Sequence, residues 1–326
     1  MHYERIVRNI VKATRKLTAG LIAAVRAEDH LSCVLLVRAI AQHAQKPVAL
    51  TLKSTQQLPA ELVTAVSLMK LKGLYINGLR EEDPTALRAV FGAIPTHSPL
   101  CLLGLQGTKS VSALVDDLGS LLRRSASLQQ LDLRGTGIND AALLAVFQAL
   151  ERNQTLHTLH LGGNRAALVD YYSEVCNGLV SLLKANSCIK TLSLKLCTIG
   201  ISCKTDFIDE LSTNQNITAL NLYRANLTDD DIAAILGHNT VLESITLYKY
   251  PYNHSSTIAK ALKSNPSTAL KQLVGFELCD QECMYAMKLD NHFGYSTNAK
   301  ILKYLRELRW QGKVEVKRVR LILVGN

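Results

Sequence analysis

Leucine and isoleucine return along this chain in the pattern Leu-x-x-Leu-x-Leu. Four clean copies occupy Leu128-Leu131-Leu133, Leu156-Leu159-Leu161, Ile189-Leu192-Leu194 and Ile217-Leu220-Leu222. The middle position of a copy lies 28 residues from its counterpart in four places, at 103/131, 131/159, 192/220 and 245/273. A fixed period of this size indicates a solenoid built from repeated units.

Each period predicts a strand, a turn and a helix. In an extended segment alternate side chains point to one face, so the leucines of a copy are expected to turn inward and the residues between them outward. The stretch 139–150 has apolar residues at helical spacing behind Asn139, a residue type that caps helices. Thr228 precedes three aspartates in the same way, where negative charge complements the helix dipole.

These residues resemble the leucine-rich repeat family, and the period with its helical second half is similar to the ribonuclease-inhibitor-like class. The resemblance covers residues 48–279 in about nine units. Their middle positions are Leu50, Leu74, Leu103, Leu131, Leu159, Leu192, Leu220, Ile245 and Leu273. It implies an α/β solenoid of horseshoe shape, with parallel strands on the concave face and helices on the convex face.

The resemblance also implies a polar residue in the turn, three positions after the last strand leucine. Asn164 and Cys197 fit that position, and the hydroxyls of Thr108 and Thr136 can substitute. Ala225 cannot, and Asn226 lies one place late. The interval from 159 to 192 is longer than the others, which indicates a bulge or an extended helix around residues 169–172.

Composition favours a cytoplasmic protein with reduced thiols. The chain has 326 residues, is 48% hydrophobic, and contains no apolar run of the roughly 18 residues that span a bilayer. Its N-terminus lacks the order of charged, apolar and cleavage segments that marks a signal peptide. The eight cysteines are scattered, so we expect no disulfide framework. Glycosylation-like triplets begin at Asn153, Asn216, Asn226 and Asn253, and without an export signal we expect them to be unused.

The net charge of +10 is partly concentrated at the ends of the chain. Basic residues between positions 5 and 16 alternate with apolar ones at helical spacing. We interpret residues 1–47 as an N-terminal helical cap, because the exposed end of a solenoid needs a polar-faced cover. The alternatives are weak membrane association and a mitochondrial targeting helix.

The sequence shows no catalytic signature and no metal site. His157 and His160 are three residues apart, so in a strand they point to opposite faces. Cys279 and Cys283 could share a helix face, but two ligands do not make a zinc site. We therefore expect no enzyme activity and no cofactor in these residues.

The C-terminal residues 314–326 end in a β-branched apolar run followed by Gly325. Such a run is typical of a buried parallel strand that feeds a phosphate-binding loop. With the helical stretch 298–308 before it, this segment resembles the junction in Roco-family proteins, where leucine-rich repeats precede a Ras-like GTPase called Roc. The resemblance implies a C-terminal cap and linker helix over 280–313, a first Roc strand over 314–326, and GTP and Mg²⁺ bound only in a longer parent protein. The alternative is a terminal capping strand.

The outward strand residues are expected to form columns on the concave face, because neighbouring strands lie about 4.8 Å apart. One column, directly after the last strand leucine, changes from basic to aromatic along the chain. The residues expected to bind a partner are Asp132, Arg134, His160, Lys195, Asn221, Tyr223, Tyr248, Tyr250 and Phe276. Tyrosine and arginine are enriched in binding hot spots. Alternatively, the tyrosines at 248–252 cover a poorly formed repeat and Phe276 fills a cap.

The sequence therefore predicts a repeat domain that binds protein, either an external partner or a GTPase domain of the same polypeptide that it helps to regulate. The first alternative is a free-standing cytosolic repeat scaffold or inhibitor. The second is a nucleic-acid-binding repeat protein. Asp132 interrupts the basic side of the concave face, much of the positive charge belongs to the two ends of the chain, and no RNA-binding motif is present, so this alternative is disfavoured.

Overall fold

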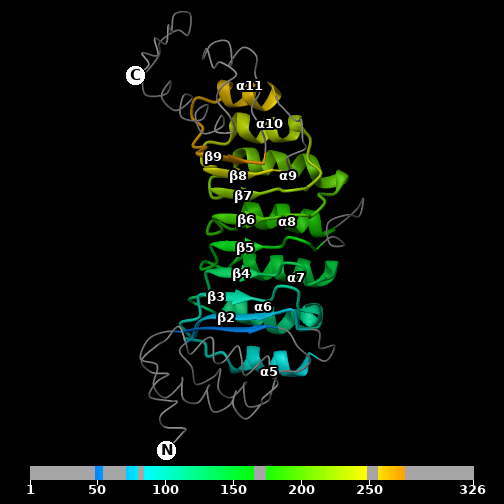
Figure 1. Cartoon of the computed structure of the whole chain (residues 1–326), viewed down its shortest axis with the longest axis vertical. Coiled ribbons are helices and arrows are strands. Elements are labelled where there is room, and N and C mark those ends of the chain that lie inside the picture. The colour runs from blue at the N-terminus through cyan, green and yellow to red at the C-terminus, as the bar shows by residue number, and fades with distance from the viewer. Residues whose placement is uncertain (1–47, 54–70, 80–83, 165–173, 248–255, 276–326) are drawn as a thin grey trace, which may run out of the picture.

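The computed structural model of the chain describes residues 48–53, 71–79, 84–164, 174–247 and 256–275. In these residues nine strands form one parallel sheet, in chain order (Figure 1). The strands are β1 (Val48–Lys53), β2 (Leu71–Asn77), β3 (Leu102–Gly104), β4 (Gln130–Asp132), β5 (Thr158–His160), β6 (Thr191–Ser193), β7 (Ala219–Asn221), β8 (Ser244–Thr246) and β9 (Gln272–Val274). Each strand contains one of the nine middle positions of the leucine pattern.

Helices alternate with the strands and stack along one side of the sheet (Figure 1). They are α5 (Thr85–Ala93), α6 (Val115–Arg124), α7 (Asp140–Glu151), α8 (Glu174–Ala185), α9 (Ile201–Thr213), α10 (Asp229–His238) and α11 (Ser256–Ser264), with a 3-10 helix η1 (Lys109–Leu114) before α6. The fold is thus an α/β leucine-rich repeat solenoid with strands on the concave face and helices on the convex face, as the sequence predicts.

The core is a stack of equivalent leucines. Leu131 pairs with Leu103 on one side and with Leu159 on the other. Leu131 and Leu159 have no exposed surface, and Leu192 has 1%. Because burying one leucine stabilises by about 1.5–3 kcal/mol, each repeat contributes to a core that is continuous along the solenoid.

The two predicted helix caps are confirmed. The Asn139 side chain accepts a hydrogen bond from the Ala142 amide at the start of α7. At the start of α10, the Thr228 hydroxyl accepts from the Asp231 amide and the Asp231 carboxylate accepts from the Thr228 amide. Both arrangements satisfy amides that the first turn of a helix leaves without partners, so they fix where each helix begins.

The polar residues predicted in the turns after the strands are all buried, namely Thr108, Thr136, Asn164 and Cys197. The amide of Asn164 donates to the main-chain oxygens of Leu133, at 2.7 Å, and Leu161, at 2.9 Å, so it joins two successive repeats. The Cys197 thiol contacts the Leu161 oxygen at 3.4 Å. Burial raises the pKa of Cys197 to about 11, which keeps its thiol protonated near neutral pH and able to donate.

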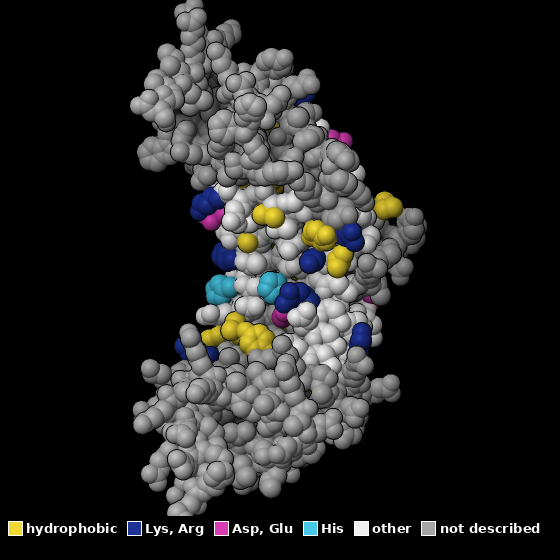
Figure 2. Space-filling model, in the orientation of Figure 1, with side chains coloured by type: hydrophobic (Ala, Val, Ile, Leu, Met, Phe, Trp, Pro, Cys, Tyr) yellow, Lys and Arg dark blue, Asp and Glu magenta, His cyan; other side chains and the backbone are white. Residues whose placement is uncertain are grey.

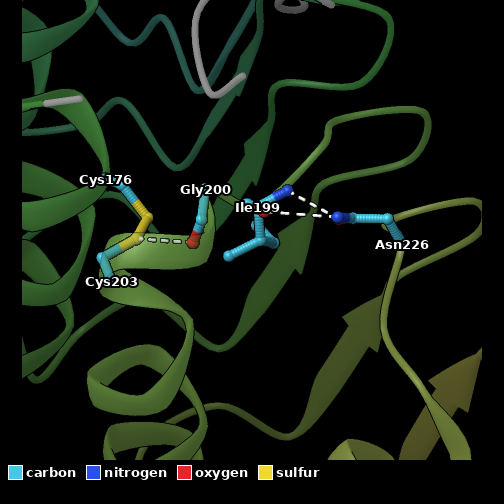
Figure 3. Close-up of a disulfide and its surroundings, with 5 residues drawn as sticks. All are labelled: Cys176, Ile199, Gly200, Cys203 and Asn226. Atoms are coloured by element: carbon cyan, nitrogen blue, oxygen red, sulfur yellow. Dashed lines mark hydrogen bonds between the residues drawn. A yellow bond between two sulfur atoms is a disulfide. The ribbon is translucent and has the colours of Figure 1, made fainter. Parts of the chain in front are cut away.

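The turn after β7 has Ala225 at this position, and the side chain of the next residue, Asn226, bonds to the preceding repeat instead. The Asn226 side-chain oxygen accepts from the Ile199 amide at 2.9 Å, and its nitrogen donates to the Ile199 oxygen at 3.4 Å (Figure 3). Asn226 has a φ of 51°, in the left-handed region that asparagine tolerates better than most residues. Although it stands one position late, this asparagine therefore still links two successive repeats.

A second series of buried polar residues lies where the helices return to the strands. It consists of Asn153, Asn186, Asn214, Asn239 and Asn265. Asn186 donates to the main-chain oxygens of Leu150 and Asn153, and its own oxygen accepts from the amides of Cys188 and Ile189. These asparagines satisfy backbone groups of two repeats at once. This series was not predicted from the sequence.

The burial of Asn153 also bears on its glycosylation-like triplet. Its side-chain nitrogen donates to the Leu122 oxygen at 2.7 Å, and the residue is only 6% exposed. A glycan must be attached to that nitrogen on an accessible surface. The folded chain therefore cannot carry a glycan at Asn153.

The expectation of reduced thiols is wrong for one pair, because Cys176 of α8 and Cys203 of α9 form a disulfide (Figure 3). Their Cα atoms are 6.1 Å apart, and the two residues lie 27 positions apart, about one repeat. Repetition thus places two buried helix positions side by side within bonding reach. The Cys203 sulfur also contacts the Gly200 oxygen at 3.5 Å. The free cysteines of the described residues are Cys101, Cys188 and Cys197.

Several predictions concern residues outside the described ranges. These are the N-terminal cap over 1–47, the irregularity around 169–172, the cap and linker over 280–313, and the strand over 314–326. Within the described residues, no helix combines the length and the apolar character needed to cross a membrane.

Candidate functional site

The concave face presents two columns of side chains that point away from the leucine core. In the first column, strand pairing sets Asp132 beside His160, and Ser193 beside Asn221. The second column follows the last strand leucine of each unit and contains Gln106, Arg134, Gly162, Lys195 and Tyr223. Figure 2 shows basic, histidine and hydrophobic side chains near the middle of the visible face, over the strands. Repetition therefore brings these side chains together from separate units.

Asp132 and Arg134 form a tightly coupled ion pair at the end of β4. The Arg134 Nε lies 2.9 and 3.0 Å from the two carboxylate oxygens, and its main-chain amide donates to Oδ1 at 3.0 Å. The Asp132 side chain is only 8% exposed, whereas that of Arg134 is 44% exposed. The hydrogen bond to Asp132 raises the pKa of Arg134. The pair holds the guanidinium in a fixed direction and offsets much of its charge.

His160 lies beside this pair and is half-buried. Burial lowers the pKa of its imidazole, the Asp132 charge acts against that shift, and the Arg134 charge adds to it. The imidazole is therefore neutral near pH 7 and offers hydrogen bonds rather than charge. His157, just before β5, is exposed. No cluster of three or more histidine, cysteine, aspartate or glutamate residues suited to a metal ion occurs in the described residues.

Asn221 orients the main chain at the end of β7 as Asp132 does at the end of β4. Its side-chain oxygen accepts from the Tyr223 amide at 3.1 Å, and Asp132 accepts from the Arg134 amide at 3.0 Å. In both units a polar strand residue thus bonds to the residue two positions later. The contact fixes the direction in which the second column leaves the sheet.

Lys195, Tyr223 and Arg224 form a cationic and aromatic group. The Lys195 Nζ lies 5.2 Å from the centroid of the Tyr223 ring, and the Arg224 Cζ lies 5.7 Å from it, both within range of cation–π attraction. Gly162 makes room for this group, because a Cβ at that position would lie 2.8 Å from the Lys195 oxygen. Lys195 and Arg224 are exposed and Tyr223 is partly buried.

The structure gathers the predicted residues into two neighbouring groups on one face. The first is Asp132, Arg134 and His160, and the second is Lys195, Asn221 and Tyr223. The predicted residues Tyr248, Tyr250, Phe276 and Gly325 lie outside the described residues. Leu196 and Arg224 were not predicted from the sequence, although a signal was present. Four equivalent turns have glycine at this position, namely Gly78, Gly107, Gly135 and Gly163.

The comparisons with known proteins agree with this architecture. A family model described as "Leucine Rich repeat" matches residues 124–147. The protein phosphatase 1 regulatory subunit 37 homolog of Caenorhabditis briggsae is 26% identical over 178 residues, which are 52% of this chain and 19% of that protein. The chain thus spans about a fifth of that relative's length.

Among solved structures, the leucine-rich repeat-containing protein LegL7 from Legionella pneumophila superimposes with a TM-score of 0.51 and is 18% identical. The alignment covers 86% of this chain and 87% of that one. At this identity the likeness concerns the fold. Together with the nine-stranded parallel sheet and the turn asparagines, it identifies this chain as a protein of the leucine-rich repeat fold.

Proposed function

We propose that this chain is a protein-binding regulatory module whose partner lies across the concave face. The observation that carries the proposal is the preorganised pair of side-chain groups at the ends of β4, β5, β6 and β7. Arg134 is held by Asp132, and the Tyr223 ring lies beside Lys195. Side chains already fixed before binding lose less conformational freedom on association, so they contribute more of their contact energy to affinity.

The regulatory part of the proposal is supported by the relative from Caenorhabditis briggsae, whose name describes a regulatory subunit of a phosphatase. A module of this kind needs no active site of its own, and the concave groups provide binding contacts rather than a nucleophile and a base. We place the protein in the cytoplasm, where a repeat domain of this kind would meet such an enzyme. Disulfides are rare in that compartment, so the Cys176–Cys203 bond would form there only under oxidising conditions.

A finer hypothesis places these repeats before a Roc GTPase in a Roco-family parent, with the GTPase as an intramolecular partner. Its support is the apolar run 314–324 followed by Gly325. GTP and Mg²⁺ would bind only beyond that glycine. Sequencing the transcript past Asn326 tests it: completion of GxxxxGK[ST] from Gly325 supports the parent GTPase, and any other continuation refutes it.

Site-specific photo-crosslinking tests the proposed binding face. A photoreactive residue in place of Asn221 lies on the concave face, and the same residue in place of the exposed Gln148 of α7 lies on the convex face. In cell extract, we expect position 221 to crosslink to a protein and position 148 not to do so. When that protein is purified and mixed with the chain, position 221 should crosslink to it again. Crosslinks from position 148 alone would refute a concave binding site.

A further inference from the structure

The turns after the strands share one backbone conformation but not one residue type. Gly107, Gly135 and Gly163 have positive φ angles of 73°, 62° and 79°. The equivalent residues in the next two units are Leu196, with a φ of 62°, and Arg224, with a φ of 58°. Glycine adopts this region without steric cost, whereas a branched or bulky side chain does so with strain.

A hydrogen-bond ladder explains why this conformation recurs. In the turns from Gly78 to Leu196, the amide of the left-handed residue donates to the main-chain oxygen of the preceding position in the next unit. Gly135 donates to Gly162 at 2.9 Å, and Gly163 donates to Lys195 at 2.7 Å. Leu196 donates to Tyr223, also at 2.7 Å. Glycine would serve this ladder equally well, so the ladder alone does not explain leucine and arginine at the strained positions.

Of the two strained residues, Arg224 belongs to the cationic and aromatic group and Leu196 lies beside it in the chain. Lys195 and Leu196 are consecutive, as are Tyr223 and Arg224, and the two pairs are joined by the Leu196–Tyr223 hydrogen bond. Lys195 is exposed and pairs with no carboxylate among the residues that the structure describes. Leu196 is partly buried and adds an apolar side chain. We call Lys195, Leu196, Tyr223 and Arg224 the turn patch.

We propose that the turn patch binds an acidic segment of the partner protein, and this inference rests on the proposed protein-binding function. Lys195 and Arg224 both lie within 6 Å of one ring, so their positive charges are concentrated in a small area. Glutamate or aspartate carboxylates of the partner would offset that charge, and apolar side chains beside them would contact Leu196 and the Tyr223 ring. At these two strained positions Leu196 and Arg224 would supply the partner with an aliphatic contact and a positive charge, neither of which glycine could provide.

The local charge pattern favours a short acidic peptide over a nucleic acid. In the neighbouring units the same column offers Gly162, which has no side chain, and Arg134, whose charge is offset by Asp132. A polyanion with evenly spaced phosphates requires a continuous basic track. The turn patch instead presents two cations next to an aromatic and an aliphatic side chain, which fits carboxylates alternating with apolar residues.

Fluorescence anisotropy tests the turn patch with a fluorescein-labelled peptide of alternating glutamate and leucine. The comparison probes are the same peptide with glutamine for glutamate, and a single-stranded oligothymidine. We expect the acidic peptide to bind the wild-type chain better than either probe. Lys195→Glu and Arg224→Gly should each weaken its binding about tenfold or more. Lys184→Glu, an exposed charge reversal on α8, should leave it unchanged.

The strain at Leu196 and Arg224 provides a second readout, which a merely structural role of these residues would not produce. Leu196→Gly and Arg224→Gly should weaken peptide binding while the melting temperature stays the same or rises, because glycine removes the steric cost at positive φ. The proposal is overturned if the acidic peptide does not bind, if the oligonucleotide binds better, if these variants bind normally, or if both melt well below the wild type. If position 221 crosslinks to a protein and any of these results is also obtained, the proposed protein-binding function is retained and the turn patch is not its binding site.

Discussion

The side-chain nitrogen of Asn186 lies 2.7 Å from the main-chain oxygen of Leu150, to which it donates across two successive repeats. Replacing Asn186 with alanine removes this bond and three others, and it leaves buried backbone groups without partners. We expect Asn186→Ala to lower the free energy of unfolding by about 2–4 kcal/mol, measured by urea denaturation. The neighbouring exposed Ser187→Ala should change it by less than about 0.5 kcal/mol. Equal effects of the two variants on the free energy of unfolding would show that the buried asparagine does not stabilise the fold in this way.

We expect the stability of the chain to depend on reductant, because of the Cys176–Cys203 disulfide. Closing a loop of 27 residues should stabilise the chain by about 3 kcal/mol, so dithiothreitol should lower its melting temperature. A Cys176→Ala/Cys203→Ala double variant should melt at the same temperature with and without reductant. Peptide mapping without reduction should recover the two cysteines as one linked pair. Alkylation of both in the denatured, unreduced chain would contradict the bond.

We expect the folded chain to lose stability at alkaline pH because of the Cys197 thiol. Its pKa rises from an ordinary 9.0 to about 11 in the folded chain, so between these values the unfolded chain releases the proton first. The resulting stabilisation is complete below pH 9 and disappears as pH rises toward 11, with a magnitude of about 2.7 kcal/mol. Urea denaturation of wild type and Cys197→Ser across this range checks it, since serine does not titrate there. A constant difference between the two proteins at all pH values would refute the assignment.

The repeat pattern was sufficient to predict the architecture. A leucine that recurs at a fixed interval must face a common core, and the nine predicted middle positions each lie in a strand of one parallel sheet. The helix caps at Asn139 and Thr228 could also be predicted, because capping depends on residue type within a few positions. These features are local or periodic, and the sequence displays both kinds directly.

Contacts between repeats were harder to predict. The Cys176–Cys203 bond depends on two helix positions, 27 residues apart, that meet only when neighbouring repeats stack, so the scattered cysteines gave the wrong expectation. The turn patch depends on a backbone angle that becomes evident only when Leu196 and Arg224 are aligned with the glycines of other turns. The buried asparagines do leave a signal in the sequence, because Asn153, Asn186 and Asn214 each lie three positions before the first leucine or isoleucine of a copy. Their backbone partners cannot be read from that spacing.

The central claim is that the concave side chains bind the partner while the leucines hold the fold. It is tested most directly by comparing Tyr223→Ala and Arg134→Ala with Leu192→Ala, in a thermal melt and in binding to the protein that position 221 crosslinks. Leu192→Ala should lose about 2–5 kcal/mol of stability, because that side chain is 1% exposed. Tyr223→Ala and Arg134→Ala should melt close to the wild type and lose about 2 kcal/mol of binding free energy or more. If they destabilise the chain as much as Leu192→Ala, or melt and bind normally, the concave face is not the binding surface.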